Sequence, residues 1–308
     1  MDRIPRSLLL GTILVLLVTV GVLVVDKPDG QVDDPVGVVG APEQTSEAPP
    51  VGTVDPGNIY AGLVPHRAFY SLELLPGVGA GTVGGLIGAE GVMTMSLEQT
   101  CDGWIFTQDM NALFDVAEGP TIRQTALFTS WESNDGADYR FASKVSTDGL
   151  DEVLRGDAVM AEAGGTAYYR QPETVDVSLP GGTMFPVSHT AWLIAEARAG
   201  KRQASKVVFT GSEDLQPELV NAFIADSGSI ADLPDGVRVL DVELTRRPGW
   251  NLRMAFYPMA SPSGLPTLEM RALQLDNGVA PWLIMDFGDF ATLMTAERVE
   301  ALPPPSCT

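Results

Sequence analysis

From about Tyr60 onward, apolar and polar side chains alternate with the period of two that is typical of half-buried β-strands. The alternation is clearest in five segments: VMTMSLE (92–98), VDVSL (175–179), VLDVELT (239–245), LRMAF (252–256) and LEMRALQL (268–275). In the last segment it slips after Met270, as a β-bulge or a change of partner strand requires. These segments predict the strands of a strongly curved antiparallel sheet.

Turn residues separate these runs in the way that hairpins require. Asp-Gly or Asn-Gly dipeptides lie between apolar or alternating stretches at Asp102-Gly103, Asp135-Gly136, Asp148-Gly149, Asp235-Gly236 and Asn277-Gly278. Because these residues tolerate the positive φ of tight turns, they predict many short connections between antiparallel strands.

One segment has a clear helical pattern. FPVSHTAWLIAEARAGK (185–201) has Ser188 as a candidate N-cap and Gly200 as a stop. Its apolar stripe is expected to consist of Trp192, Leu193, Ala195 and Ala197. A shorter helix is predicted at PELVNAFIA (217–225). The pattern as a whole predicts a mainly β domain over residues 60–308 with one or two helices.

The beginning of the chain has the pattern of an export signal. Arg3 and Arg6 precede the uncharged apolar run 8–25, which as a helix would span about 27 Å, close to the roughly 30 Å of a bilayer core. No small-x-small cleavage site follows, which favours a signal anchor over residues 1–25; a cleaved signal peptide is the alternative. With the arginines in the cytoplasm, either interpretation exports the rest of the chain.

Composition adds a linker and excludes one class of partner. Residues 26–59 are rich in proline, glycine and acidic side chains, which predicts a disordered linker between the apolar run and the domain. The 308 residues contain 40 acidic and 19 basic side chains, for a formal net charge of -21. Such a charge repels phosphates, so no nucleic-acid partner is expected.

No pattern typical of catalysis or metal binding emerges. The glycine-rich stretch 76–88 lacks the Gly-Lys-Ser/Thr of a phosphate-binding loop. The two histidines, His66 and His189, lie apart from any cluster of metal ligands, and there is no Gly-x-Ser-x-Gly. Ser188 and His189 are neighbours on a helix, so their side chains point apart. We therefore expect no cofactor, no metal and no catalytic residue.

Two groups of carboxylates have a structural and a chemical interpretation. Glu132, Asp135 and Asp138 suggest either a hairpin turn or a calcium loop, and they match no EF-hand register. Asp286 and Asp289 suggest either strand-end capping or the paired acids of a wall hydrolase. The structural interpretation is preferred for both groups.

Cys101 and Cys307 are the only cysteines. In an exported domain a single pair most economically forms a disulfide, while two free thiols or an intermolecular bridge are the alternatives. A disulfide here would close a loop of roughly two hundred residues, worth about 5 kcal/mol in the chain-entropy model.

Six motifs together resemble the EipB family of alphaproteobacterial periplasmic cell-envelope integrity proteins. They are VPHRAFYSLEL (64–74), TCDGW (100–104), WESNDGADYRF (131–141), GTMFPVSHTAWLIAEARAG (182–200), NGVAPWLIMDFGDF (277–290) and PPPSCT (303–308). The resemblance implies a β-spiral, which is a partly open, barrel-like antiparallel sheet wrapped around a helix. It also implies a disulfide at Cys101 and Cys307 and a periplasmic location. The apolar run itself, and not the resemblance, predicts that residues 8–25 anchor the protein to the inner membrane unless the signal is cleaved.

The resemblance brings no catalytic residues, so the expected function is non-enzymatic. We expect the protein to support envelope integrity by binding an envelope protein, and the family suggests a tetratricopeptide-repeat partner. The alternative is a lipid or glycan carrier that uses a concave apolar face of the sheet. Its candidate lining residues, which ordinary core packing explains equally well, are Met93, Met95, Met254, Phe256 and Trp282.

Overall fold

The computed structural model describes the chain over residues 59–75, 85–226, 240, 242–259 and 264–307. The predicted signal segment (1–25), nearly all of the predicted linker, most of the glycine-rich stretch and the Asp235-Gly236 turn lie outside these residues. Within the described residues, no helix is long and apolar enough to cross a membrane.

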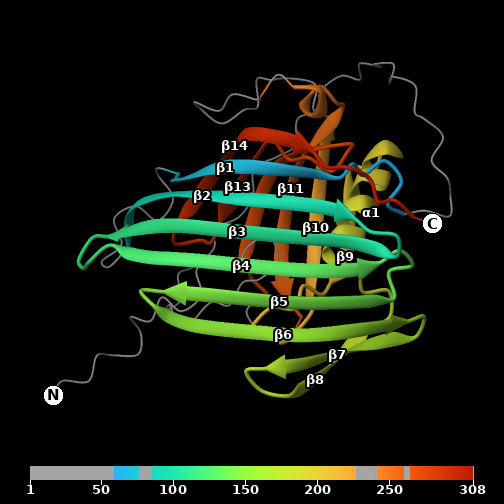
Figure 1. Cartoon of the computed structure of the whole chain (residues 1–308), viewed down its shortest axis with the longest axis horizontal. Helices are drawn as coiled ribbons and strands as arrows, with labels where there is room; N and C mark the ends of the chain where they lie inside the picture. The colour runs from blue at the N-terminus through green and yellow to red at the C-terminus, as the bar shows by residue number, and fades with distance from the viewer. Residues whose placement is uncertain (1–58, 76–84, 227–239, 241, 260–263, 308) are drawn as a thin grey trace, which may run out of the picture.

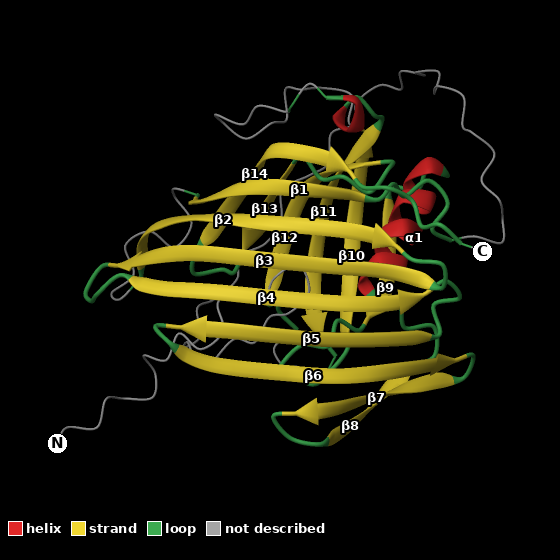
Figure 2. Cartoon of the chain, viewed as in Figure 1, coloured by secondary structure: helices red, strands yellow, loops and turns green. Residues whose placement is uncertain are grey.

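The described chain is dominated by β-strands (Figure 2). The strands are β1 (His66–Leu74), β2 (Leu86–Gln99), β3 (Gly103–Val116), β4 (Ile122–Ser133), β5 (Asp138–Thr147), β6 (Leu150–Ala161), β7 (Gly164–Gln171), β8 (Val175–Pro180), β9 (Gln203–Val208), β10 (Glu218–Asp226), β11 (Gly249–Pro258), β12 (Leu268–Leu275), β13 (Trp282–Asp286) and β14 (Ala291–Ala301). The helix α1 (Pro186–Arg198) lies between β8 and β9, and a 3-10 turn, η3 (Glu243–Thr245), precedes β11.

Within the described part of the chain, the fourteen strands form one antiparallel sheet in the order β8-β7-β6-β5-β4-β3-β2-β1-β14-β13-β12-β11-β10-β9. Strands that follow each other in sequence pair, except β8 and β9, which form the two edges, and β1 also pairs with β14 and joins the two halves. In Figure 1, β1 to β8 form a front layer and β9 to β13 lie behind it at a steep angle. The two halves of the sheet therefore face each other, which confirms the prediction of a strongly curved, barrel-like antiparallel sheet.

The connection through α1 links the two free edges of this sheet, β8 and β9. Met184, just before the helix, bridges to Val208 of β9 in parallel fashion. The amide of Met184 donates to the Val207 carbonyl, and the amide of Phe209 donates to the Met184 carbonyl, both at 2.9 Å. This seam leaves the barrel nearly closed.

The curled sheet encloses one large apolar core built from both layers. Front-layer side chains such as Phe128 and Tyr169 belong to the same buried cluster as Ile224 and Leu252 of the rear layer. A second cluster packs α1 against β2 and β3 and contains Tyr60, Leu97, Trp104, Val187 and Ala191. The helix is therefore an integral part of the interior.

Cys101 and Cys307 form a disulfide, with their Cα atoms 5.6 Å apart. It joins the turn between β2 and β3 to the segment that follows β14. The side chain of Asn134, from the neighbouring β4–β5 turn, donates to the carbonyl of Cys101 at 3.1 Å. The predicted pairing is confirmed.

Each of the four Asp-Gly or Asn-Gly turns in the described residues connects two consecutive strands, as predicted. At the β5–β6 turn both central residues have positive φ, 50° for Asp148 and 85° for Gly149. These are the backbone conformations that the sequence pattern requires.

Two predictions about secondary structure are wrong. Residues 217–225 form strand β10 rather than a helix, because this segment pairs on both sides, with β9 and β11. In 239–245 the described residues form the 3-10 turn instead of a strand, since the Thr245 hydroxyl accepts from the amide of Val242 at 3.2 Å. Such local bonds compete with a strand ladder.

At the slip in 268–275 the sequence allowed a bulge or a change of partner strand; the bulge is absent, and the pairing changes there. The register between β11 and β12 runs without a shift, and the pairing of β12 with β13 ends at Ala272. The positions of β12 that face the cavity are Met270, Ala272 and Gln274. The alternation of apolar residues stops at Gln274 because this inward side chain is polar. Register shifts occur instead at Phe69/Tyr70 and Arg155/Gly156.

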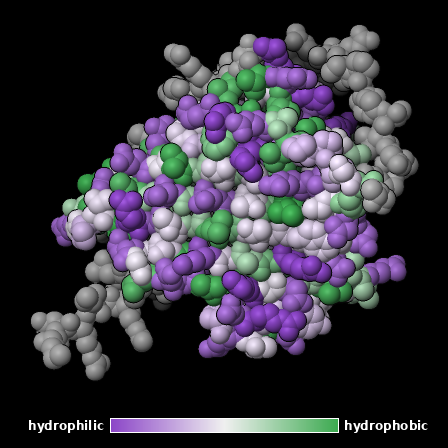
Figure 3. All heavy atoms as spheres, in the orientation of Figure 1, coloured by the Kyte–Doolittle hydropathy of each residue, from purple (hydrophilic) through white to green (hydrophobic). Residues whose placement is uncertain are grey.

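The outer face of the front layer mixes hydrophilic and hydrophobic residues (Figure 3). Apolar side chains such as Val92 of β2 and Leu127 of β4 are exposed there. Alternation along the strands thus places the core inside, while the outer face carries polar residues together with scattered apolar ones.

Candidate ligand-binding cavity

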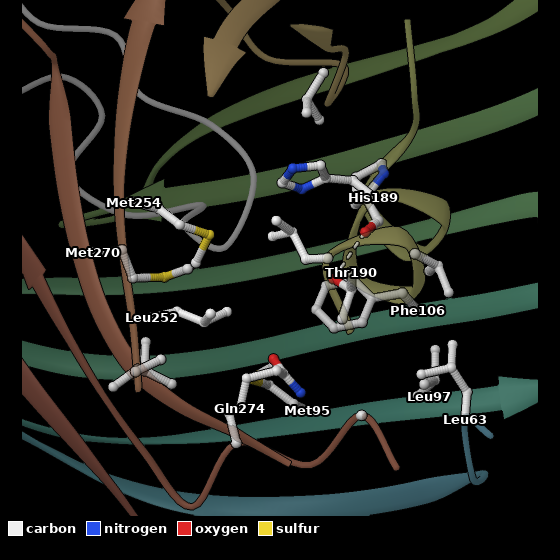
Figure 4. Close-up of a pocket in the computed structure, with 18 of the residues that line it drawn as sticks. Leu63, Met95, Leu97, Phe106, His189, Thr190, Leu252, Met254, Met270 and Gln274 are labelled. Atoms are coloured by element: carbon white, nitrogen blue, oxygen red, sulfur yellow. Dashed lines mark hydrogen bonds between the residues drawn. The ribbon is translucent and has the colours of Figure 1, made fainter. Parts of the chain in front are cut away.

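A cavity of about 130 Å³ lies in the interior, between α1, the front strands β2 and β3, and the rear strands β11 and β12. Figure 4 shows side chains from both layers and the helix pointing into it. Its walls are mostly apolar, and no Asp, Glu, Lys or Arg is among the described residues that line it. Its apolar walls include Met95, Leu97, Phe106, Leu252, Met254, Phe256 and Met270.

The structure brings together three of the five predicted lining residues. Met95, Met254 and Phe256 line the cavity, from β2 and β11. Met93 lies on the same strand face as Met95 but is fully buried in the core beyond the cavity. Trp282 lies on the opposite face of β13, in a small cluster with Ile284 and two residues of β14. Whether any of them contacts a ligand stays a prediction.

The helix wall of the cavity is positioned by a buried carboxylate. Glu132, at the end of β4, accepts hydrogen bonds from the backbone amides of Val187 at 2.5 Å and Ser188 at 2.9 Å. These amides lie in the first turn of α1, where unpaired N–H groups and the helix dipole favour a negative charge. Burial outweighs the two hydrogen bonds, however, and raises the pKa of Glu132 to about 7.

The prediction that Ser188 is the N-cap of α1 is wrong. The N-cap is Phe185, and Ser188 occupies the third helical position. Its hydroxyl accepts from the Phe185 amide at 3.1 Å and donates to the Phe185 carbonyl at 2.9 Å. The capping carboxylate comes from Glu132, far away in sequence, so local pattern could not identify it.

Both histidines line the cavity. The Nδ1 of His66 donates to the Val64 carbonyl at 2.7 Å, and burial lowers the pKa of this side chain. His189, on the first turns of α1, is also buried, and its Nε2 has no hydrogen-bond partner among the described residues. The sequence placed His189 on a helix but gave no sign that it faces a cavity, because the opposite walls come from β2, β3, β11 and β12.

The other carboxylates have structural roles. Asp135 accepts from the Ser133 hydroxyl and the Ala137 amide, which fixes the β4–β5 hairpin turn. These two hydrogen bonds, in that order, hold the pKa of Asp135 below its usual value. Asp286 accepts from the Gly288 amide at 2.9 Å and so caps the turn after β13. Among the described residues there is no cluster of three or more His, Cys, Asp or Glu side chains that could hold a metal ion.

Comparison with known proteins places this fold among cell-envelope proteins. The chain is 28% identical over 232 residues to the cell envelope integrity protein EipB of Brucella abortus (strain 2308), which covers 74% of this chain and 81% of that protein. It is also similar to the crystal structure of a beta-barrel-like protein of the domain of unknown function DUF1849 from Brucella abortus. That similarity has a TM-score of 0.71 at 25% identity and covers 78% of this chain and 99% of the other.

The sequence model of one family, described as EipB-like, matches residues 58–303. This range contains all the described strands and the cavity. The chain therefore belongs to the EipB-like family.

Proposed function

We propose that this chain supports the integrity of the cell envelope as a non-enzymatic binding protein, and that its cavity holds an apolar molecule of the envelope. The observation that carries the proposal is the cavity itself, which lies between the two layers of the sheet and has no charged side chain among the described residues that line it. The sequence alone favoured a protein partner; the cavity moves the carrier function to first place.

The composition of the walls suits a flexible chain. Met95, Met254 and Met270 are unbranched and polarisable, and such side chains adapt to ligands of irregular shape. Ligand sites are commonly apolar cavities with few polar groups. An alkyl or acyl chain of a lipid fits this description better than a glycan, because a glycan would need many hydrogen-bonding partners.

Membership of a cell-envelope family and an intramolecular disulfide together indicate an extracytoplasmic protein. We further propose that residues 8–25 anchor it to the inner membrane. Cell fractionation with an antibody against the described domain tests the anchor: the protein should stay with the membrane after a high-salt wash, and release by salt alone would contradict it.

The carrier function is tested by filling the cavity. Ala272 of β12 lines it, so the substitution Ala272→Phe should exclude a ligand. Ala255 of β11 lies on the opposite face of the sheet, between Asn221 and Glu269, and Ala255→Phe is the matched control. Cells with Ala272→Phe should become sensitive to detergent and to wall-active antibiotics, while cells with the control variant stay resistant. Equal resistance of both, at equal protein levels, would contradict the carrier function.

A protein partner is the second candidate, supported by an exposed apolar surface beside an open edge. On the outer face of β10, Phe223 is 57% exposed and Leu219 is 36% exposed, and both pair with the edge strand β9. Exposed aromatic side chains are typical contact residues of interfaces. We propose that an envelope protein, with tetratricopeptide-repeat proteins as the first candidates, binds this surface.

Crosslinking in whole envelopes tests this candidate. Phe223→Asp should abolish capture of the partner, whereas Leu127→Asp, an exposed apolar position on β4 far from this edge, should not. The same partner captured by both variants would contradict an interface on β10.

A further inference from the structure

Two polar atoms in the apolar cavity have no partner within the described residues. They are Nε2 of His189, a residue 7% exposed, and Oγ1 of Thr210, a residue 3% exposed. Both residues line the cavity. Buried polar atoms are nearly always hydrogen-bonded, and leaving one unpaired is unfavourable. Among the ten buried side-chain atoms without a partner in the described residues, these two belong to residues that line the cavity, where a bound molecule could pair with them.

The imidazole of His189 is aimed at the space between the two layers. Figure 4 shows it extending from α1 toward Met254 of the rear layer. Neighbouring Thr190, which also lines the cavity, differs in that its hydroxyl donates to the Pro186 carbonyl within the helix at 3.0 Å. Adjacent positions of one helix thus present one satisfied polar group and one unsatisfied one.

The ring is neutral at physiological pH. Burial, followed by the charge of Lys206, lowers the pKa of His189 to about 3. Lys206 itself does not line the cavity: its Nζ lies 5.4 Å from the ring centre of Trp192. A neutral imidazole offers one N–H donor and one acceptor nitrogen, and a threonine hydroxyl likewise both donates and accepts.

The walls select against a charged ligand group. Without a charged lining residue, a carboxylate, phosphate or ammonium inside the cavity would lose its hydration with no opposite charge to replace it. An uncharged hydroxyl loses far less, and it can accept from one of the two groups while donating to the other. The unpaired polar atoms and the apolar walls thus both favour a ligand whose buried polar group is an uncharged hydroxyl.

We propose that the buried part of the ligand is an alkyl or acyl chain carrying an uncharged hydroxyl, which hydrogen-bonds to His189 Nε2 and to Thr210. This proposal rests on the proposed carrier function and specifies its ligand class. His189 acts as the specificity determinant, and the surrounding methionines contact the chain.

Photo-crosslinking to the full chain in envelope membranes tests the proposal. The probes are decanol, decanoate and decane, each with a diazirine in the chain, and the readout is label per protein at pH 7. We compare the natural chain with His189→Leu, the matched control Thr190→Val and the filled cavity Ala272→Phe. Because each probe is compared across variants, differences in membrane partitioning cancel.

The expected loss is specific to one probe and one residue. His189→Leu should lower decanol labelling about tenfold, the equivalent of one hydrogen bond of about 1.4 kcal/mol. Decane labelling should not change, Thr190→Val should behave as the natural chain, and Ala272→Phe should lose both labels. His189→Gln, which keeps a donor and an acceptor, should retain part of the decanol labelling, and thermal melts establish that the variants are folded.

The two proposals fail in different ways. If Ala272→Phe abolishes labelling but His189→Leu leaves decanol labelling unchanged, the cavity binds chains and the role of His189 is wrong. If decanoate labels more strongly than decanol through His189, the uncharged class is wrong. If no probe labels above the Ala272→Phe level, the carrier function itself is wrong.

Discussion

The interior of this barrel has two regions with opposite properties. Near the seam, at β5 and β7, it is filled by aromatic rings in stacked and edge-to-face contact: Tyr139, Phe141, Tyr169, Phe185 and Phe209. Between α1 and β11–β12, it is lined by flexible methionine and leucine side chains and leaves a cavity of about 130 Å³. The same sheet thus builds a tightly packed region and an open one.

The tyrosine hydroxyls of the aromatic region and the His189 imidazole of the cavity differ in their hydrogen bonding. In the aromatic region, the Tyr139 hydroxyl donates to the Thr210 carbonyl at 2.9 Å and the Tyr169 hydroxyl to the Ser212 carbonyl at 2.7 Å. These bonds tie the front layer to the segment after β9 and close the seam. In the cavity, His189 Nε2 finds no partner among the described residues. We conclude that the aromatic region maintains the fold and that the cavity is available for binding.

The largest effect is expected from the disulfide, which supports the fold from outside both regions. Replacing Cys101 or Cys307 by Ser removes a crosslink between residues 206 apart in sequence, which should lower the free energy of unfolding by up to about 5 kcal/mol. Urea denaturation of the exported protein measures this. A reductant should lower the stability of the natural chain to the same level without affecting the variants. A variant as stable as the natural chain would show that the crosslink does not constrain the unfolded state.

Within the aromatic region, Phe209→Ala should lower the free energy of unfolding by about 4 kcal/mol, because a fully buried ring is lost and a cavity remains. Tyr139→Phe is the matched control: it keeps the ring and removes only the hydrogen bond to Thr210, at a cost of about 1 kcal/mol. Denaturation curves that show equal losses for the two would contradict the packing role of the cluster.

Glu132 gives the next effect, on the pH dependence of stability. Its pKa is about 7 in the folded protein and near 4.5 in the unfolded chain, so folding favours the protonated form. The contribution of Glu132 to the free energy of unfolding is fully present below about pH 4.5. It is lost as the pH rises through 7, which lowers the free energy of unfolding by about 3 kcal/mol. Glu132→Gln should therefore flatten the fall of the melting temperature between pH 5 and pH 8.

Half-buried Asp214 and buried Glu218 keep part of this slope in the variant, since burial raises the pKa of Asp214 to about 6 and that of Glu218 to about 8. Asp138→Asn, at an exposed position of the same hairpin as Glu132, serves as the control and should leave the slope unchanged. An unchanged slope in Glu132→Gln would mean that the helix cap stays ionised throughout this range.

The smallest effect is expected in the cavity wall. Met254→Leu conserves volume, so it should lower the free energy of unfolding by less than about 1.5 kcal/mol. Urea denaturation of Met254→Leu and Phe209→Ala under the same conditions compares the cavity wall directly with the aromatic region. A loss at Met254 as large as that at Phe209 would show that the cavity wall is packed as tightly as the aromatic cluster.

Patterns within short segments predicted much of the fold. Period-two alternation identified β2, β8 and β11, Asp-Gly dipeptides identified hairpin turns such as Asp148-Gly149, and the motif 185–201 identified α1. The failures arose where long-range contacts decide. Residues 217–225 form a strand because two neighbouring strands flank them, and this pairing is not visible in the segment itself.

The site was less predictable for the same physical reason. Alternation placed Met95, Met254 and Phe256 on inward faces, but it could not separate lining residues from a packed residue such as Met93. Trp282 was assigned to the wrong face, because β13 is apolar on both sides and has no alternation to follow. The cavity also depends on how far the wall strands lie from α1, and this distance is set by the curvature of the whole sheet rather than by any short segment.

The central claim, that the cavity holds an alkyl or acyl chain carrying an uncharged hydroxyl, is tested most directly by analysing what the protein carries. The chain is purified from envelopes after export, extracted with organic solvent and examined by mass spectrometry, next to Ala272→Phe. The account predicts a compound with a hydroxyl-bearing alkyl or acyl chain from the natural protein and none from the variant. Identical extracts from both proteins, or an extract without any such compound, would contradict it.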